Sequence, residues 1–151
     1  MKVYRISKCQ YIDDLKGTGA ASYPGRWHSK GTYVLYTAAT ASLALLESVV
    51  HMAKIPAKDY CIICLEIPDG KIQEIPFDSL PSYWQAQPAP DILKNIGDSF
   101  VKEGKFFALK LPSAIMPEDF NYLLNPNHPD ASSIKIVFKR LVQVDERLLK
   151  K

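Results

Sequence analysis

Long hydrophobic runs are absent from this sequence. No stretch approaches the ~20 consecutive apolar residues of a membrane-spanning helix, and the first residues, Met1 to Arg5, lack the apolar core of a secretory signal peptide. A strong charge of one sign is missing too, because the net charge is only +3. These absences argue against a membrane protein and against direct nucleic-acid binding, and they predict a cytoplasmic protein.

Cysteine is scarce, with only Cys9, Cys61 and Cys64. Cys61 and Cys64 have the CxxC spacing of redox and zinc motifs, but no second pair completes a four-ligand zinc site. They lie in an apolar, β-branched run, and residues three apart in a strand point to opposite faces. We therefore expect plain buried thiols, no metal, and a reducing compartment.

Familiar catalytic and nucleotide-binding motifs are also missing. The sequence holds no GxSxG, no P-loop and no GxGxxG. A cysteine–histidine nucleophile pair could be assembled from Cys9 and either His28 or His128, but no spacing supports it. A cysteine-dependent hydrolase is therefore the weakest of the enzyme classes considered.

The chain that remains has an ordinary globular composition, with 47% hydrophobic and 23% charged residues, which excludes a disordered or fibrous protein. Its 151 residues predict a single domain over 1–151. Strand and helix patterns are mixed without regular βαβ alternation, which indicates an α+β fold.

The expected elements follow from apolar patterns and turn residues. We predict helices over about 40–54 and 90–102, long loops over 11–32 and 117–133, and strands over 3–6, 33–36, 60–67, 72–75, 106–111 and 134–144.

One region groups a cation, aromatic rings and a carboxylate. Arg26 and Trp27 lie in a glycine-flanked loop, Tyr36 ends a short strand, and Glu47 is on the next helix. These groups together suit an anionic, planar ligand. Two structural alternatives stay open: Glu47 as a solvated helix residue paired with His51, and Arg26 as a surface residue stacked on Trp27.

Three further polar residues are candidates. Arg5 alternates with Val3 on the first strand, so a buried Arg5 needs a carboxylate or an anionic ligand. Ser113 and Asn125 each lie beside a proline, and each can equally serve to satisfy backbone groups of a turn.

Taken in order, these residues resemble the RES family, the toxin halves of bacterial toxin–antitoxin pairs. The resemblance covers nearly the whole chain. Its segments are Tyr4-Arg5-Ile6, Gly17-Thr18-Gly19, Gly25-Arg26-Trp27-His28, Gly31, Val34-Leu35-Tyr36, Ala44-Leu45-Leu46-Glu47, Leu111-Pro112-Ser113-Ala114, Asn121-Tyr122-Leu123-Leu124-Asn125-Pro126 and His128-Pro129.

The resemblance implies an ADP-ribosyltransferase-like fold, a split β-sheet core with flanking helices around an NAD cleft. It implies that NAD+ is the substrate and is cleaved at the nicotinamide–ribose bond, either depleting NAD+ or transferring ADP-ribose to a protein, with no metal. It also implies a cognate antitoxin with an Xre-like helix-turn-helix domain, and a homodimer is possible within the complex.

The chemistry of this implied reaction assigns roles to the candidate catalytic residues. Glu47 would stabilise the oxocarbenium-like transition state formed as nicotinamide leaves. Arg5 would help to hold the pyrophosphate, and Tyr36 would form an aromatic wall for nicotinamide.

The expected NAD+-binding residues are Arg26, Trp27, Ser113 and Asn125. Arg26 would be the second cation of the pyrophosphate clamp, and Trp27 a second choice for the aromatic wall. Ser113 would hydrogen-bond the ribose or support Arg5. The competing interpretation is a non-catalytic nucleotide-binding or partner-binding module that uses the same cleft.

Overall fold

The computed structural model describes residues 1–52 and 58–149. One mixed sheet has the strand order β4-β5-β6-β2-β1-β3-β7. The strands are β1 (Lys2–Lys8), β2 (Leu35–Ala38), β3 (Tyr60–Glu66), β4 (Ile72–Glu74), β5 (Ala108–Pro112), β6 (Phe120–Leu124) and β7 (Lys135–Leu141). The α-helices are α1 (Thr18–Ser22), α2 (Ala41–Val49) and α3 (Lys94–Glu103), and short 3₁₀ turns cover Cys9–Tyr11, Phe77–Ser79, Asp91–Leu93, Pro129–Ser133 and Glu146–Leu149.

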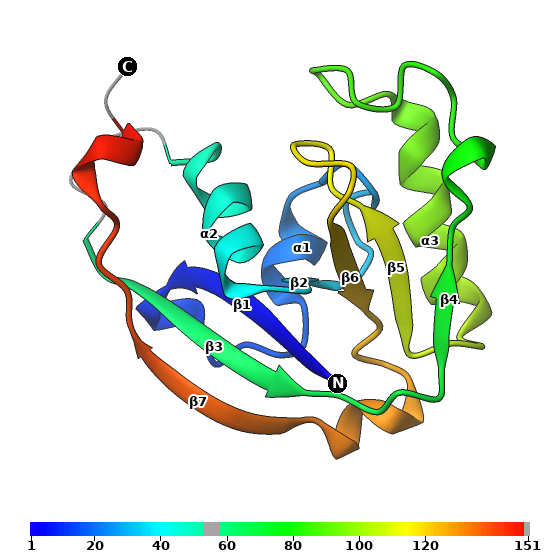
Figure 1. Cartoon of the computed structure of the whole chain (residues 1–151). Helices are drawn as coiled ribbons and strands as arrows, with labels where there is room; N and C mark the ends of the chain where they lie inside the picture. The colour runs from blue at the N-terminus through cyan, green and yellow to red at the C-terminus, as the bar shows by residue number, and fades with distance from the viewer. Residues whose placement is uncertain (53–57, 150–151) are drawn as a thin grey trace.

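The sheet is split between β1 and β2. β1 pairs with β3 along its whole length, but its ladder with β2 has the single pair Tyr4 and Ala38. Figure 1 shows the result: β1, β3 and β7 form one half, while β2, β6, β5 and β4 form the other. The expected α+β class with a split sheet is therefore confirmed.

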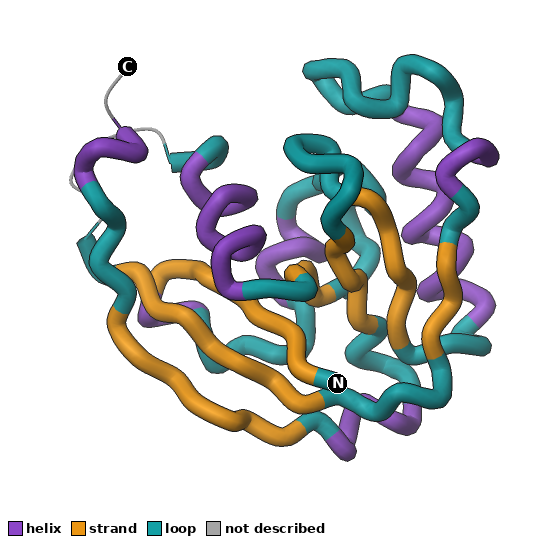
Figure 2. Tube along the Cα trace, in the orientation of Figure 1, coloured by secondary structure: helices purple, strands orange, loops and turns teal. Residues whose placement is uncertain are grey.

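Helices flank both halves of the sheet, as the purple segments in Figure 2 show. On one side of β1, Tyr4 and Ile6 pack against α2 residues, including Leu43 and Leu46. On the other half, Phe100 of α3 packs against the buried leucines of β5 and β6. Gly97 of α3 touches the backbone carbonyl of Trp27, so the helix lies against the loop that carries Arg26.

Local sequence signals explain the helix ends. Thr40 caps α2 by accepting a hydrogen bond from the Leu43 N–H at 3.1 Å. Gly104, with φ +60°, ends α3 in the left-handed conformation that glycine adopts without strain. Helix α2 ends at Val49, earlier than expected, and Lys54 lies outside the described residues.

Two elements were missed in segments expected to be loops. Strand β6 lies within 117–133, and the short helix α1 lies within 11–32. Prolines and asparagines around the five-residue strand β6 are typical of a loop, so the sequence did not indicate a strand there. Its last three residues, Tyr122, Leu123 and Leu124, are buried. Their side chains fill both faces, so no polar alternation reveals the strand.

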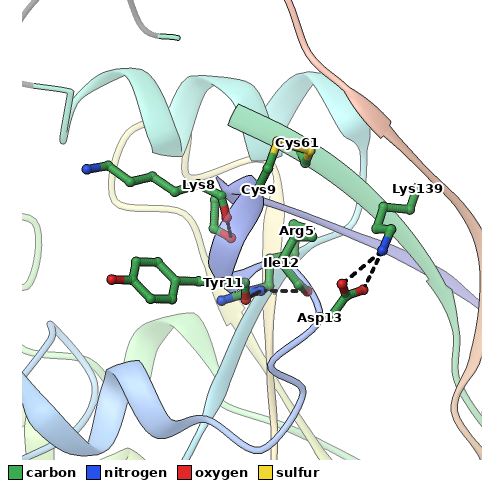
Figure 3. Close-up of polar contacts among 9 residues, drawn as sticks. Arg5, Lys8, Cys9, Tyr11, Ile12, Asp13, Cys61 and Lys139 are labelled. Atoms are coloured by element: carbon green, nitrogen blue, oxygen red, sulfur yellow. Dashed lines mark hydrogen bonds and ion pairs between the residues drawn. A yellow bond between two sulfur atoms is a disulfide. The ribbon is translucent and has the colours of Figure 1, made fainter. Parts of the chain in front are cut away.

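The expectation of plain buried thiols was wrong for two of the three cysteines. Cys9 and Cys61 form a disulfide, and only Cys64 is a free, buried thiol among the described residues. Figure 3 shows this bond joining the turn after β1 to the start of β3. The two CxxC sulfurs do diverge, because Cys61 bonds to Cys9 and leaves Cys64 inside the core.

Candidate active site

A cavity of about 500 Å³ lies where the sheet splits. Its walls come from β1, β2, α2 and β6, and from the loops around residues 25–27, 87–89 and 114–115. This volume is within the ordinary range of small-molecule sites. Glu47, Arg5, Arg26 and Tyr36, all expected from the sequence, line it together.

Glu47 reaches from α2 to the other half of the sheet. Its Oε1 accepts hydrogen bonds from Ser113 Oγ at 2.7 Å and from Asn121 Nδ2 at 2.6 Å. The alternative in which Glu47 pairs with His51 is not observed in residues 1–52 and 58–149. An acceptor of two donors suits an ionised carboxylate held in one orientation.

Ser113 is itself fixed by backbone groups. Its Oγ accepts hydrogen bonds from the N–H groups of Ile115 and Met116, both at 3.1 Å. The hydroxyl hydrogen is therefore directed at Glu47, and Ser113 is fully buried. Ser113 supports Glu47 rather than Arg5, which corrects one of the two roles expected for it.

Tyr36 has a buried hydroxyl in contact with His28. The phenolic oxygen lies 2.8 Å from His28 Nδ1 and accepts a hydrogen bond from the Trp27 N–H at 3.3 Å. Burial raises the pKa of Tyr36 well above its ordinary value, so the phenol stays neutral. The ring of Tyr36 lines the cavity.

Arg26 lies on the cavity wall with its guanidinium anchored to a neighbouring loop. Nη1 donates to the carbonyl oxygens of Trp84 at 2.7 Å and Ala86 at 3.3 Å. Burial lowers the pKa of Arg26 below its ordinary value, and the charge of Glu47 acts in the opposite direction.

Trp27 is part of the core rather than a surface platform. It is 3% exposed, and its ring centroid lies 6.1 Å from that of Trp84. The alternative of a surface stack between Arg26 and Trp27 is therefore not observed among the described residues. Trp27 contributes to the cavity wall from behind Arg26.

Arg5 also reaches the cavity, and it is held by backbone carbonyls rather than by a carboxylate. Its Nη1 donates to the carbonyl oxygens of Tyr11 at 3.2 Å and Ile12 at 3.1 Å, as Figure 3 shows. Burial lowers the pKa of Arg5, and the charge of Asp14 acts in the opposite direction. The disulfide of Cys9 anchors the turn that supplies these carbonyls.

Asn125 is not among the residues that line the cavity. Its Oδ1 accepts a hydrogen bond from the Asn127 N–H at 3.0 Å, and its backbone N–H donates to the carbonyl oxygen of Phe107. These contacts shape the turn after β6. Of the seven residues expected at the site, five line the cavity; Ser113 does not but contacts Glu47, and Asn125 shapes this turn instead.

Residues 1–52 and 58–149 hold no candidate metal site and no candidate membrane span. Within them, no group of three or more His, Cys, Asp or Glu side chains lies close enough to hold a metal ion. No helix in that part of the chain is long and apolar enough to cross a bilayer.

The model of the RES domain family matches residues 2–148. The chain belongs to the RES domain family. Three curated relatives of this RES domain are toxins by name. "Toxin Res" of Photorhabdus laumondii is 35% identical over 153 residues, covering 99% of this chain and 98% of the relative. "Toxin Res" of Pseudomonas putida is 38% identical over 140 residues, covering 90% and 92%.

The third relative is the "Prs ADP-ribosylating toxin" of Sphingobium, 35% identical over 144 residues and covering 92% of this chain and 89% of the relative. A chain in the crystal structure of the M. tuberculosis MbcT-MbcA toxin-antitoxin complex has the same fold. The TM-score is 0.77 at 13% identity, over 94% of the RES domain and 84% of that chain.

Two residues of the RES domain site were missed as hydrogen-bond partners of its key side chains. Asn121 contacts Glu47, and His28 contacts Tyr36. Asn121 was placed in an expected loop, where its direction could not be inferred. A signal was present, because Asn121 is a lone polar residue before a buried run of three.

Proposed function

We propose that this RES domain is the toxin of a toxin–antitoxin pair and cleaves NAD+ at the nicotinamide–ribose bond. The observation that carries the proposal is the Glu47 carboxylate, held by two donors in a cavity that also contains two arginines and a buried tyrosine. The names of the relatives support a toxin, and one of them supports ADP-ribose chemistry.

Glu47 would provide the electrostatic stabilisation. Positive charge develops on the ribose as nicotinamide leaves, and a carboxylate fixed in advance stabilises that charge without reorganising. Both protein donors act on Oε1, which leaves Oε2 to face the ribose or one of its hydroxyls. Ser113 takes part through Glu47, because its hydroxyl is already committed to that carboxylate.

Arg26 and Arg5 would bind the pyrophosphate. In the described part of the chain, each guanidinium uses Nη1 for two carbonyl oxygens. Nη2 and Nε then form a fork that matches two phosphate oxygens. We assign Arg26 to the phosphate nearer the reacting ribose, because Arg26 lines the same cavity as Glu47 and is influenced by its charge, while Asp14 acts on Arg5.

Tyr36 would form the wall against which nicotinamide packs. Its hydroxyl is in contact with His28 and Trp27, so its ring, rather than its oxygen, is the part offered to a ligand. Trp27 holds this wall from the core side.

An antitoxin would keep the enzyme inactive until it is released. We propose a partner with an Xre-like helix-turn-helix domain that covers the cavity and offers a carboxylate to Arg5 or Arg26 in place of the pyrophosphate. A homodimer of the RES domain within that complex fits the same proposal. The site of action would be the cytoplasm, where NAD+ is available.

The test is to incubate the purified chain with NAD+ and to measure nicotinamide, ADP-ribose and protein mass by mass spectrometry. Free ADP-ribose in proportion to nicotinamide indicates hydrolysis. An ADP-ribose adduct on a protein of an added bacterial extract indicates transfer. Tight NAD+ binding without any nicotinamide release would contradict the enzyme and favour the alternative, a nucleotide-binding or partner-binding module.

A further inference from the structure

The two protein hydrogen bonds to the Glu47 carboxylate both reach the same oxygen, Oε1. Ser113 Oγ and Asn121 Nδ2 both donate to Oε1, at 2.7 and 2.6 Å. Asn121 makes the shorter of the two contacts. Because a carboxylate only accepts hydrogen bonds, the amide group of Asn121 that faces it must be the NH₂.

Asn121 lies on an interior strand of the sheet. β6 lies between β2 and β5, and the backbone of Asn121 is paired with Ala38 on one side and Leu111 on the other. The two ladders fix the backbone from which the amide extends toward Glu47.

Glu47 is on helix α2, which is not held by strand ladders. Helix α2 has nine residues and packs mainly on β1 and β2. The contacts from Glu47 to Asn121 and Ser113 cross the cavity to β6 and to the end of β5. They therefore tie the carboxylate of a helix that packs where the two halves meet to β6 and to the residue that follows β5.

Two donors on one oxygen determine the direction of the other oxygen. A single hydrogen bond from Ser113 leaves the carboxylate free to turn about its terminal bond, whose rotation is broad. A second donor on Oε1 removes that freedom, and Oε2 then points one way into the cavity. We propose that Asn121 is a positioning residue that fixes the reactive orientation of Glu47.

This inference rests on the proposed cleavage of NAD+. Because Asn121 acts through Glu47, its loss should reduce kcat and leave KM for NAD+ nearly unchanged, since pyrophosphate binding uses Arg26 and Arg5. Loss of a residue that only supported the fold would lower kcat and raise KM together, or would lower the melting temperature.

The decisive variant is Asn121→Asp, which keeps the shape and exchanges the NH₂ for an oxygen. Two carboxyl groups at hydrogen-bond distance share one proton, and the second deprotonation of such a pair has a raised pKa. With one proton on the pair, the introduced carboxyl group donates to Glu47 much as the amide does. With none, the two carboxylates repel each other and Glu47 turns away.

We therefore expect Asn121→Asp to retain activity at low pH and to lose kcat by about tenfold or more as the second proton leaves, an alkaline loss absent from the parent chain. Arg26 and Tyr36, which also interact with Glu47 or its surroundings, are unchanged in this variant. The matched control is Asn125→Asp, just beyond the end of the same strand, where an oxygen already accepts from Asn127. Its pH profile should match that of the parent chain.

A second measurement separates the positioning role of Asn121 from the proposed cleavage of NAD+. The carboxyl carbon of Glu47, labelled with ¹³C, is titrated by NMR without NAD+. Two coupled steps in Asn121→Asp against one step in the parent chain support the positioning role. Identical titrations and identical pH–kcat profiles would overturn it. Failure of the proposed function is a different result: no nicotinamide is released by the parent chain at any pH, whatever the titration shows.

Discussion

The hydroxyl of Tyr36 is hydrogen-bonded to the imidazole of His28, and both ring nitrogens of this histidine have partners. Nε2 of His28 faces the carbonyl oxygens of Ala20 at 2.7 Å and Tyr23 at 3.0 Å, so Nε2 carries a hydrogen. In the neutral ring Nδ1 must then accept, and Tyr36 donates to it over 2.8 Å. The chain thus fixes a cavity-lining ring through a histidine that does not line the cavity.

This pair predicts the effect of a methyl group at Gly25. A Cβ there would lie 2.7 Å from the Tyr36 hydroxyl and 2.8 Å from His28 Cε1, so the pair would have to separate. Gly25→Ala should lose stability by about 1–3 kcal/mol, as overpacking does, and should weaken NAD+ cleavage. Thermal unfolding and nicotinamide release measure both. Gly19→Ala, where no atom lies within 4 Å, should behave like the parent chain.

Removal of the charge at Glu47 should be the most damaging change to catalysis. Glu47→Gln keeps the shape of the side chain and should lower kcat by about 10²-fold or more, as the loss of one electrostatic stabiliser does. The melting temperature should change little. Glu66→Gln, at an exposed position of β3, is the matched control. A folded Glu47→Gln protein with near-normal turnover would return Glu47 to a structural role.

Replacement of either arginine by lysine should change the binding of NAD+ (KM) rather than the chemical step (kcat). Arg26→Lys and Arg5→Lys keep the charge but lose the fork, so KM for NAD+ should rise by about tenfold for each charge-assisted hydrogen bond lost. Steady-state kinetics give the comparison, with exposed Arg140→Lys as control. An unchanged KM at one position would show that its guanidinium serves only the carbonyl oxygens that it already contacts.

Tyr36 should make the protein less stable at alkaline pH. Burial raises its folded-state pKa above the ordinary value of 10.0, so the unfolded chain releases this proton first. The stability that neutral Tyr36 contributes is complete below pH 10 and is lost as the pH rises through the folded-state pKa. The free energy of unfolding should therefore fall less steeply above about pH 10 in Tyr36→Phe than in the parent chain. The free energy of unfolding is measured by urea titration at a series of pH values. The same pH dependence in Tyr36→Phe and in the parent chain would contradict this prediction.

The disulfide should stabilise the fold without taking part in catalysis. Loss of the bond between Cys9 and Cys61, 52 residues apart, should reduce the free energy of unfolding by about 2–4 kcal/mol. Activity per folded molecule should persist, because the Cys9 N–H still donates to the Asp59 carbonyl oxygen and holds the turn. A double serine variant at Cys9 and Cys61 should be insensitive to dithiothreitol, unlike the parent chain. Abolished cleavage in a folded double variant would contradict the prediction.

Much of the fold could be predicted from local patterns, because most strands are apolar runs between turn residues. The start of α2 was predicted at Thr40 or Ser42, of which Thr40 is the cap, and the end of α3 was predicted at Gly104. The strand β6 was not, since its five residues lie among prolines and asparagines and both of its faces are covered. Burial on both faces is a tertiary property that a local pattern does not contain.

The site, too, was predicted only in part. Residue type and family resemblance predicted that Glu47, Arg26 and Tyr36 lie at one site, and all three line the cavity. They could not place Asn121, because its neighbour Glu47 is 74 residues earlier in the chain. The disulfide was missed for a related reason: Cys9 and Cys61 meet only because β1 and β3 pair in one register.

The order of these residues along the chain has a consequence during translation. Ser113 and Asn121 follow Glu47 by 66 and 74 residues, and β6 must insert between β2 and β5 before the amide is in place. A nascent chain that has left the ribosome as far as α2 carries the carboxylate but neither of its donors. The cell that makes this protein therefore meets an assembled site only after most of each molecule has been synthesised.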